Sequence, residues 1–303
     1  MKRNILLLFT FFACITVQGQ TPVRLVDLRS EHLDRPIGLD NPVPRLSWRM
    51  EDGRQGAVQT SWRIVVDEDS LNVVNGCGRM WDSGKNDSRN QLVAYAGKKL
   101  QPFTRYYWKV ICSDMEYKET ASPVSYFETG MMGMQHWQGA WIGDGKDIHY
   151  GPAPYFRKEF KTGKKVKSAR AYIAAAGLYE LYINGEKIGD HCLAPLYTRF
   201  DRRNLYVAYD VTSQLQNGDN AIGVLLGNGW YNHQSKAVWD FDRAPWRNRP
   251  TFCLDLRITY TDGSVETIPT DLSWRTASGA ITFNSIYTCL LYTSPSPRDM
   301  RRS

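Results

Sequence analysis

The segment from Asn228 to Asn248 combines aromatic rings, a primary amide and a guanidinium group, and it has little strand pattern. Sugar rings present apolar C–H faces that aromatic rings can contact and hydroxyl groups that planar amides can bind. Long loops of this kind often carry binding sites. The pattern therefore predicts either contact with a carbohydrate or packing against a neighbouring domain, and both interpretations stay open. The candidate residues are Asn228, Trp230, Tyr231, Trp239, Trp246 and Arg247.

Carboxylates are the second set of side chains that could do chemistry, because glycoside hydrolysis needs two of them on either side of the scissile bond. Distance along the chain cannot pair them, so we assign no catalytic residue. The acidic run Asp67–Asp69 offers oxygen ligands to a cation, but its place between a strand and a turn predicts solvated surface. Other acidic residues fall in expected loops of the second half: Asp144, Asp147, Asp190, Asp201 and Asp240.

Other catalytic chemistries find no support in these residues. The five histidines lack zinc-type spacing, and no Ser or Cys occupies a nucleophile elbow. Gly227–Gly229 lacks the third glycine and the following helix of a dinucleotide-binding loop. The cysteines are too far apart for a metal knuckle or a redox pair, so the sequence predicts no required cofactor.

The formal net charge of +7 does not indicate a nucleic-acid partner. Lys2 and Arg3 contribute two of these charges at the start, and the residues from Arg298 to Arg302 contribute two more. The remaining cations are scattered, with no run longer than Lys164–Lys165, so no stripe could follow a phosphate backbone.

Residues 1–20 have the pattern of a secretory signal peptide. Lys2 and Arg3 precede an apolar run from Ile5 to Val17, and small and polar residues follow. The run is too short to span a bilayer as a helix, and no later window is long enough. The residues before Cys14 make a poor lipobox, which argues against a lipid anchor. We therefore expect an exported, periplasmic or extracellular protein without a membrane span.

Short runs with period-two alternation fill the rest of the chain, and no long segment has helical spacing, so the sequence predicts an all-β protein. We expect one β-sandwich over residues 21–131 and a second over 136–287. In the first, bulky side chains such as Trp48, Trp62 and Trp108 lie on single strand faces. The pattern from Leu100 to Val110, with Tyr106 near the start of a strand, resembles fibronectin type III and immunoglobulin-like sandwiches.

The second block has about eight expected strands, which suits a jelly roll of the galactose-binding type. Asn184–Gly185 predicts a tight turn, and Asp262–Gly263 predicts a hairpin between neighbouring strands. After Tyr287 the alternation stops. We therefore expect residues 288–303 to be a non-native or disordered tail, with read-through of a sequencing adaptor and a natural disordered end as the two interpretations.

An ordered set of phrases resembles the bacterial α-L-rhamnosidases of the helical-barrel type, over residues 23–287. Each phrase alone is weak evidence for a family, but the whole set in this order makes the resemblance specific. The phrases are Asn41–Trp48 (NPVPRLSW), Trp81–Lys85 (WDSGK), Tyr106–Val110 (YYWKV), Trp141–Gly143 (WIG), Tyr182–Gly185 (YING), Gly227–Tyr231 (GNGWY) and Ile281–Tyr287 (ITFNSIY).

The resemblance implies that these sandwiches are accessory modules and that an (α/α)₆ barrel, which has no match here, holds the catalytic acids. It implies hydrolysis of terminal α-L-rhamnose from glycans by the parent enzyme, an inactive fragment here, and docking of the modules onto the barrel. Some relatives bind rhamnose through calcium, which makes Asn184 and Asn228 candidate calcium or sugar ligands, although the tight turn alone explains Asn184. The alternative is a standalone carbohydrate-binding or adhesion protein.

Overall fold

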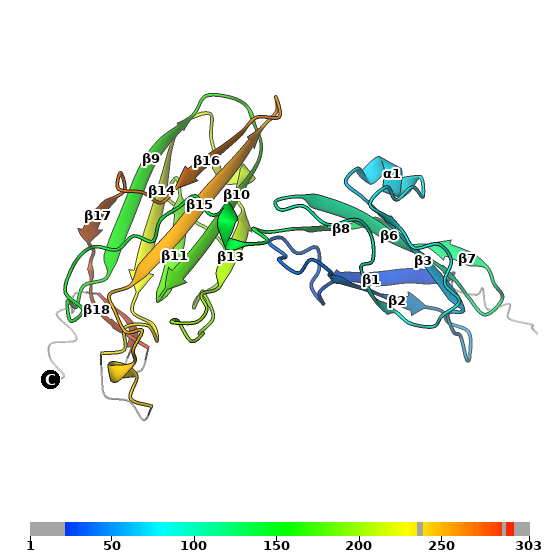
Figure 1. Ribbon diagram of the computed structural model, residues 1–303, viewed down its shortest axis with the longest axis horizontal. Coiled ribbons are helices and arrows are strands. Elements are labelled where there is room, and N and C mark those ends of the chain that lie inside the picture. Colours follow the sequence, from blue (N-terminus) through cyan, green and yellow to red (C-terminus); the bar gives the residue numbers. More distant parts are fainter. Residues whose placement is uncertain (1–21, 235–238, 287–288, 294–303) are drawn as a thin grey trace, which may run out of the picture. The chain divides into compact units, whose positions relative to one another are not determined.

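The computed structural model describes residues 22–234, 239–286 and 289–293, and nearly all of its regular elements are β-strands (Figure 1). The period-two pattern explains why. In β6 (Arg105–Ser113), Tyr106, Trp108 and Val110 are fully buried, while the residues between them are half-exposed. Alternation of this kind places every second side chain on one face of a strand. The all-β prediction is confirmed.

The first compact unit comprises residues up to Pro36, Pro42–Lys99 and Arg105–Phe127. It is built on a three-stranded sheet of order β1-β2-β5 and a second sheet of order β4-β3-β6-β7, in which β8 also pairs with β6. The elements up to β8 are β1 (Arg24–Ser30), β2 (Arg45–Glu51), β3 (Ser61–Asp67), α1 (Ser70–Val74), β4 (Trp81–Asp82), β5 (Leu92–Ala94), β6, β7 (Glu119–Ala121) and β8 (Ser125–Glu128).

Aromatic side chains fill the core of this first sandwich. Trp48 and Trp62 meet edge to face with ring centroids 6.1 Å apart, and Trp48 Nε1 donates a hydrogen bond to Gln59 Oε1 at 2.8 Å. The ring of Tyr106 is fully buried and lies 5.4 Å from that of Phe127. The tryptophan and tyrosine positions predicted to form the sandwich core therefore do so.

In the acidic run Asp67–Asp69, the expectation of solvated surface is confirmed for Glu68 and Asp69, which are exposed, and wrong for Asp67. Asp67 is buried, accepts backbone N–H groups of Asp69 and Arg79, and forms an ion pair with the Arg79 guanidinium at 3.0 Å. Burial alone would raise the pKa of Asp67, but the hydrogen bonds from Arg79 and the two amides hold it well below its usual range. Asp69 caps helix α1 by accepting from the N–H of Leu71.

The second compact unit comprises Ile37–Asn41, Leu100–Thr104 and the chain from Glu128 onward. A four-stranded sheet of order β13-β10-β15-β16 and a five-stranded sheet of order β12-β11-β14-β9-β17 form its sandwich. The elements are η1 (Met134–His136), β9 (Pro154–Thr162), β10 (Val166–Ala176), β11 (Leu178–Ile183), β12 (Glu186–Lys187), β13 (Tyr206–Asp210), η2 (Thr212–Gln214), β14 (Gly218–Gly227), η3 (Phe241–Arg243), β15 (Thr251–Tyr260), β16 (Val265–Pro269), β17 (Arg275–Ser278), β18 (Ile281–Ser285) and β19 (Cys289–Thr293).

Apolar side chains from both sheets meet in the core of this unit. Ile173 and Leu254 come from the four-stranded sheet, and Leu181 and Val224 come from the five-stranded sheet; each is at most 1% exposed. Fully burying side chains of this size stabilises the fold by about 1.5–3 kcal/mol each. The jelly-roll prediction agrees with this two-sheet arrangement.

Asn184 and Gly185 connect β11 to β12 with φ angles of 51° and 86°, as a two-residue hairpin turn requires. The end of the described chain differs from expectation. Backbone pairing joins β19 to β18, so Cys289–Thr293 forms a strand where we expected a tail without structure. Residues 1–20, expected to be the signal peptide, and residues 294–303 lie outside the described residues.

Candidate functional site

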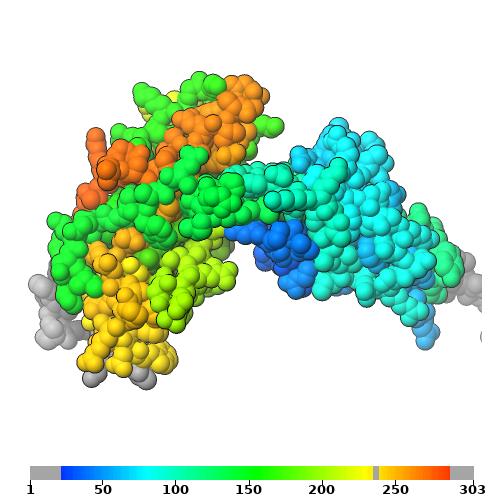
Figure 2. Space-filling view, viewed as in Figure 1, coloured from blue at the N-terminus to red at the C-terminus, as the bar shows by residue number. Residues whose placement is uncertain are grey.

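Two loops of the second unit bring seven aromatic side chains together. One loop connects β12 to β13 and the other connects β14 to β15, which appears in yellow at the end of the sandwich in Figure 2. Trp230 is central, with ring centroids 5.5 Å from Phe241, 6.3 Å from Trp239 and 6.3 Å from Tyr197. We name this set the aromatic cluster: Tyr197, Phe200, Trp230, Tyr231, Trp239, Phe241 and Trp246.

The outer side of the aromatic cluster is exposed. Trp239 is 61% exposed and Tyr197 46%, and the neighbouring Leu196 is 75% exposed. Large apolar side chains gathered in this way on a surface mark a site of contact with another molecule or domain. The structure therefore brings together Trp230, Trp239 and the other aromatic candidates that the sequence singled out.

A network of buried amides supports the inner side of the cluster. The backbone N–H of Asn228 donates to Asn284 Oδ1 at 2.6 Å, and Asn232 Nδ2 donates to Asn228 Oδ1 at 3.2 Å. Arg247 Nε continues the network to Asn232 Oδ1 at 3.2 Å. Asn228 is only 2% exposed, so its side chain supports the loop from inside and does not present its amide to solvent.

A buried ion pair holds the C-terminal base of the same loop. Arg249 Nη2 lies 2.8 Å from Asp144 Oδ2, and each side chain is 6% exposed. The guanidinium also donates to the carbonyl oxygens of Tyr150 and Pro152. Since every contact is charge-assisted and shielded from water, this pair fixes the loop firmly against the sandwich.

Four buried polar atoms around the loop have no hydrogen-bond partner within the described part of the chain: Gln234 Nε2, Asp242 Oδ1, Trp246 Nε1 and Arg247 Nη2. Most buried polar groups in proteins are hydrogen-bonded, so several unpaired groups in one loop are unusual. They are three donors and one acceptor, and each is shielded from solvent, so a sugar hydroxyl group can reach them only if the loop opens.

Asn184 lies far from this cluster. β11 and β14 pair from Leu178↔Gly227 to Ile183↔Ile222, which places Asn184 and Asn228 beyond opposite ends of the pair. With a rise of about 3.3 Å per residue they are roughly 20 Å apart, so one calcium ion with ligands at about 2.3–2.6 Å cannot contact both. Among the described residues, no three His, Cys, Asp or Glu side chains gather as a metal site.

Both polar atoms of the Asn184 side chain form hydrogen bonds around the turn. Its amide nitrogen donates to Gln214 O at 2.8 Å and to Asn220 Oδ1 at 2.9 Å, and its oxygen accepts the N–H of Ala221 at 2.9 Å. These contacts fix the hairpin and engage both polar atoms of the side chain, so the turn itself accounts for asparagine at this position.

Three of the five loop carboxylates have close structural partners. Asp144 is tied to Arg249, Asp201 pairs with Arg199 at 2.9 Å, and Asp147 accepts the backbone N–H of His149. Asp190 is exposed with its carboxylate 3.7 Å from His191, and Asp240 begins η3 in a left-handed conformation. A glycosidase acid needs a raised pKa. Burial raises the pKa of the Asp255 carboxyl group, but this group accepts the backbone N–H groups of Gln138 and Gly139 inside the fold.

Sequence reasoning missed Tyr197, Phe200 and Phe241 in the aromatic cluster, and Asn232 and Asn284 in the amide network. Phe241 and Asn232 lie inside the segment already singled out, so its composition could have included them. The other three come from different loops and strands, and only the pairing of distant strands brings them close.

None of the described helices is long and apolar enough to cross a membrane.

Comparison with known proteins identifies the two sandwiches. Residues 25–133 match the Rha78A-like N-terminal immunoglobulin domain, and residues 164–294 match the α-L-rhamnosidase N-terminal domain. An α-L-rhamnosidase of Formosa agariphila is 32% identical over 94% of this chain and 33% of its own length. One from Alteromonas sp. is 30% identical over 83% of this chain and 28% of its own length.

A solved structure gives the same family. The α-L-rhamnosidase of Dictyoglumus thermophilum superposes with a TM-score of 0.81 at 37% identity, over 88% of this chain and 31% of that protein. The chain thus spans about a third of the length of the curated relatives it matches. By these two consecutive domains, the chain belongs to the α-L-rhamnosidase family, whose amino-terminal region it represents.

Proposed function

We propose that this chain is the non-catalytic front part of an exported enzyme that hydrolyses terminal α-L-rhamnose from glycans. The observation that supports it is the consecutive match to both amino-terminal domains of α-L-rhamnosidases. The curated relatives are about three times longer than the matched region, which leaves room for a separate catalytic domain such as the (α/α)₆ barrel of the resemblance.

The carboxylates on the outer face of the five-stranded sheet support a non-catalytic role. Partial burial alone would raise the pKa of Glu180, but hydrogen bonds from Lys187 and Tyr182 lower it. Glu180 is therefore ionised at neutral pH and cannot donate a proton to a leaving group. Glu159, on β9 at another position of that face, forms an ion pair with Arg157 at 2.7 Å.

Reading the gene beyond codon 303 tests this proposal. An in-frame continuation that encodes long amphipathic helices supports the proposal that the chain is part of an enzyme. A genuine stop codon at that point contradicts it and favours the alternative, a standalone carbohydrate-binding or adhesion protein. Export is tested by whether residues 1–20 are removed when the chain is made in a bacterial host.

The exposed aromatic cluster is proposed to pack against the rest of that enzyme. Trp239 and Leu196 would then be covered in the whole enzyme, and the chain alone should self-associate through them. Trp239→Ser should reduce self-association in sedimentation experiments. Leu272→Ser is the matched control, because Leu272 is fully exposed but lies outside the cluster. Equal self-association of Trp239→Ser and the control contradicts docking through this surface.

Sugar contact is a second role for the same loop, favoured by its exposed aromatic rings, such as that of Trp239. Titration calorimetry with L-rhamnose, with and without calcium, tests it. We expect heat of binding that Trp239→Ala reduces, because alanine removes the exposed ring that would lie against the apolar face of the sugar. Absence of binding contradicts this second role and leaves docking as the function of the loop.

A further inference from the structure

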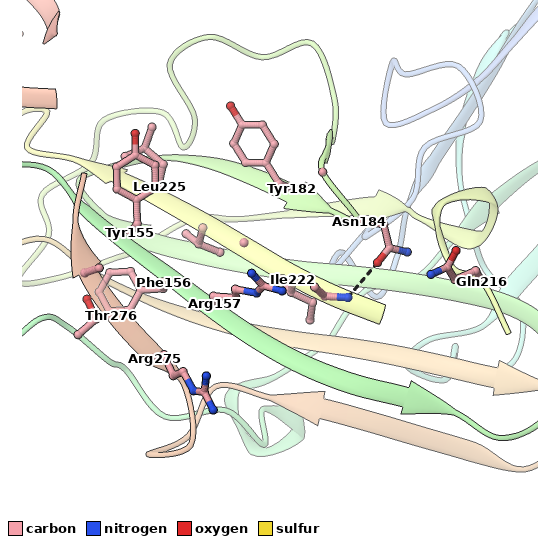
Figure 3. A pocket seen from close by; sticks show the side chains of 15 residues that line it. Tyr155, Phe156, Arg157, Tyr182, Asn184, Gln216, Ile222, Leu225, Arg275 and Thr276 are labelled. Atoms are coloured by element: carbon pink, nitrogen blue, oxygen red, sulfur yellow. Dashed lines mark hydrogen bonds between the residues drawn. The ribbon is translucent and has the colours of Figure 1, made fainter. Parts of the chain in front are cut away.

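The outer face of the five-stranded sheet holds a hollow of about 830 Å³, distinct from the aromatic cluster. Its floor is the central strand β14, which presents Ala221 and Gly223 there, and its sides come from β9, β11 and β17 (Figure 3). Gly223 stands opposite Arg157 on β9 and Tyr182 on β11. Since glycine has no side chain, the surface at Gly223 lies deeper than at the two larger residues on either side. We call this hollow the sheet groove.

Two arginines stand side by side in the sheet groove. Arg275 on β17 is the direct cross-strand partner of Arg157 on β9, and both line the groove. Like charges at directly opposed positions destabilise a sheet. Arg157 has Glu159 as a partner, but the side chain of Arg275 makes no ion pair or hydrogen bond within the described ranges. No Asp or Glu is among the residues that line the groove.

Two tyrosines beside the arginines are held in fixed positions. The Tyr182 hydroxyl donates to Glu180 Oε2 at 2.7 Å, and Lys187 binds the other oxygen of that carboxylate. Tyr155 is 37% exposed and lies directly against the backbone of Gly279, where a Cβ atom would come within 1.3 Å of its ring. Fixed rings lose little conformational entropy when a ligand packs on them.

We propose that the sheet groove binds an acidic saccharide, with a uronate carboxylate between Arg275 and Arg157 and the adjoining sugar ring over Gly223 beside the tyrosines. The planar guanidinium fork matches a carboxylate in geometry as well as charge. A bound anion also removes the repulsion between the two arginines. The proposal rests on the proposed role in glycan processing only for the choice of a rhamnose-containing probe.

Titration calorimetry on the full chain at low salt, with a disaccharide of rhamnose and glucuronic acid, tests the proposal. The wild-type chain should bind this probe, and raising the salt concentration should weaken binding. The methyl ester of the same disaccharide, which keeps its shape but lacks the charge, should bind about tenfold more weakly or not at all. Rhamnose sulfate, an anion without a carboxylate, is titrated in the same way as a second probe.

Arg275→Gln should weaken binding of the acidic disaccharide by about tenfold or more. Lys167→Gln removes one positive charge from an exposed position of β10 in the other sheet and should bind like wild type. Equal unfolding midpoints of the two variants in urea show that both are folded.

The proposal is overturned if wild type does not bind, if the ester binds as well as the acid, or if Arg275→Gln binds as well as Lys167→Gln. Binding of rhamnose sulfate alone overturns the uronate assignment. Because the titration involves no hydrolysis and no downstream sequence, failure here leaves the proposed function of the chain intact.

Discussion

Replacing Arg249 by methionine should destabilise the second unit strongly. The guanidinium donates to both oxygens of Asp144, at 2.8 and 3.1 Å, and to the carbonyls of Tyr150 and Pro152. Methionine keeps much of the volume but leaves a carboxylate that is 6% exposed without its partner. Breaking a buried pair from one side costs about 3–5 kcal/mol.

The smaller change Asp144→Asn should cost less, about 1.5–3 kcal/mol, because asparagine keeps one oxygen to accept from the guanidinium and both carbonyl contacts of Arg249 remain. The matched control is Arg199→Met, which breaks the pair with Asp201. The side chain of Arg199 is 59% exposed, and exposed pairs contribute only about 0–1 kcal/mol.

Urea unfolding followed by tryptophan fluorescence measures these losses, and hydrogen exchange assigns them to the second unit. We expect the amides of the segment from Asn228 to Asn248 to exchange faster in Arg249→Met. A free energy of unfolding for Arg249→Met within about 1 kcal/mol of that for Arg199→Met would refute the reasoning, because the pair would then not hold the loop.

Three further predictions concern the framework. Asn184→Ala should lower the free energy of unfolding by about 1–3 kcal/mol, since alanine loses three hydrogen bonds at a φ of 51°, and Asn184→Gly should recover part of this loss in the same denaturation assay. Leu181→Ala should cost about 2–5 kcal/mol by leaving a cavity in the core, measured by the shift of the urea midpoint. Because the pKa of Asp67 is lowered by folding, its contribution is present above the ordinary aspartate pKa and is lost as the pH falls below about 4. Asp67→Asn should therefore be less stable at neutral pH and lose less stability on acidification, and parallel pH dependence of both proteins would contradict this.

Local patterns were sufficient to predict much of the fold. Alternation identified the strands that carry Trp48, Trp62 and Trp108, and Asn184–Gly185 was recognised as a turn because both residues tolerate positive φ. These features depend on a few neighbouring residues. The composition of each strand face then follows from burial.

Contacts between distant segments could not be predicted. Asp144 and Arg249 are 105 residues apart, and nothing in either local pattern indicates the pair. The same holds for Arg157 and Arg275, which become neighbours only because β17 adds to the edge of β9. Asp67 was misread as solvated because its partner Arg79 comes after a short helix and is brought back to it only by the fold.

The central claim is that these sandwiches support and bind, and that bond cleavage belongs to another part of the enzyme. Incubating the purified chain with an aryl α-L-rhamnoside, from acidic to neutral pH, tests this claim most directly. We predict release of the aryl group no faster than in a blank without protein. Release above the blank that Glu180→Gln or Glu159→Gln abolishes would contradict the claim and place catalysis on the five-stranded sheet.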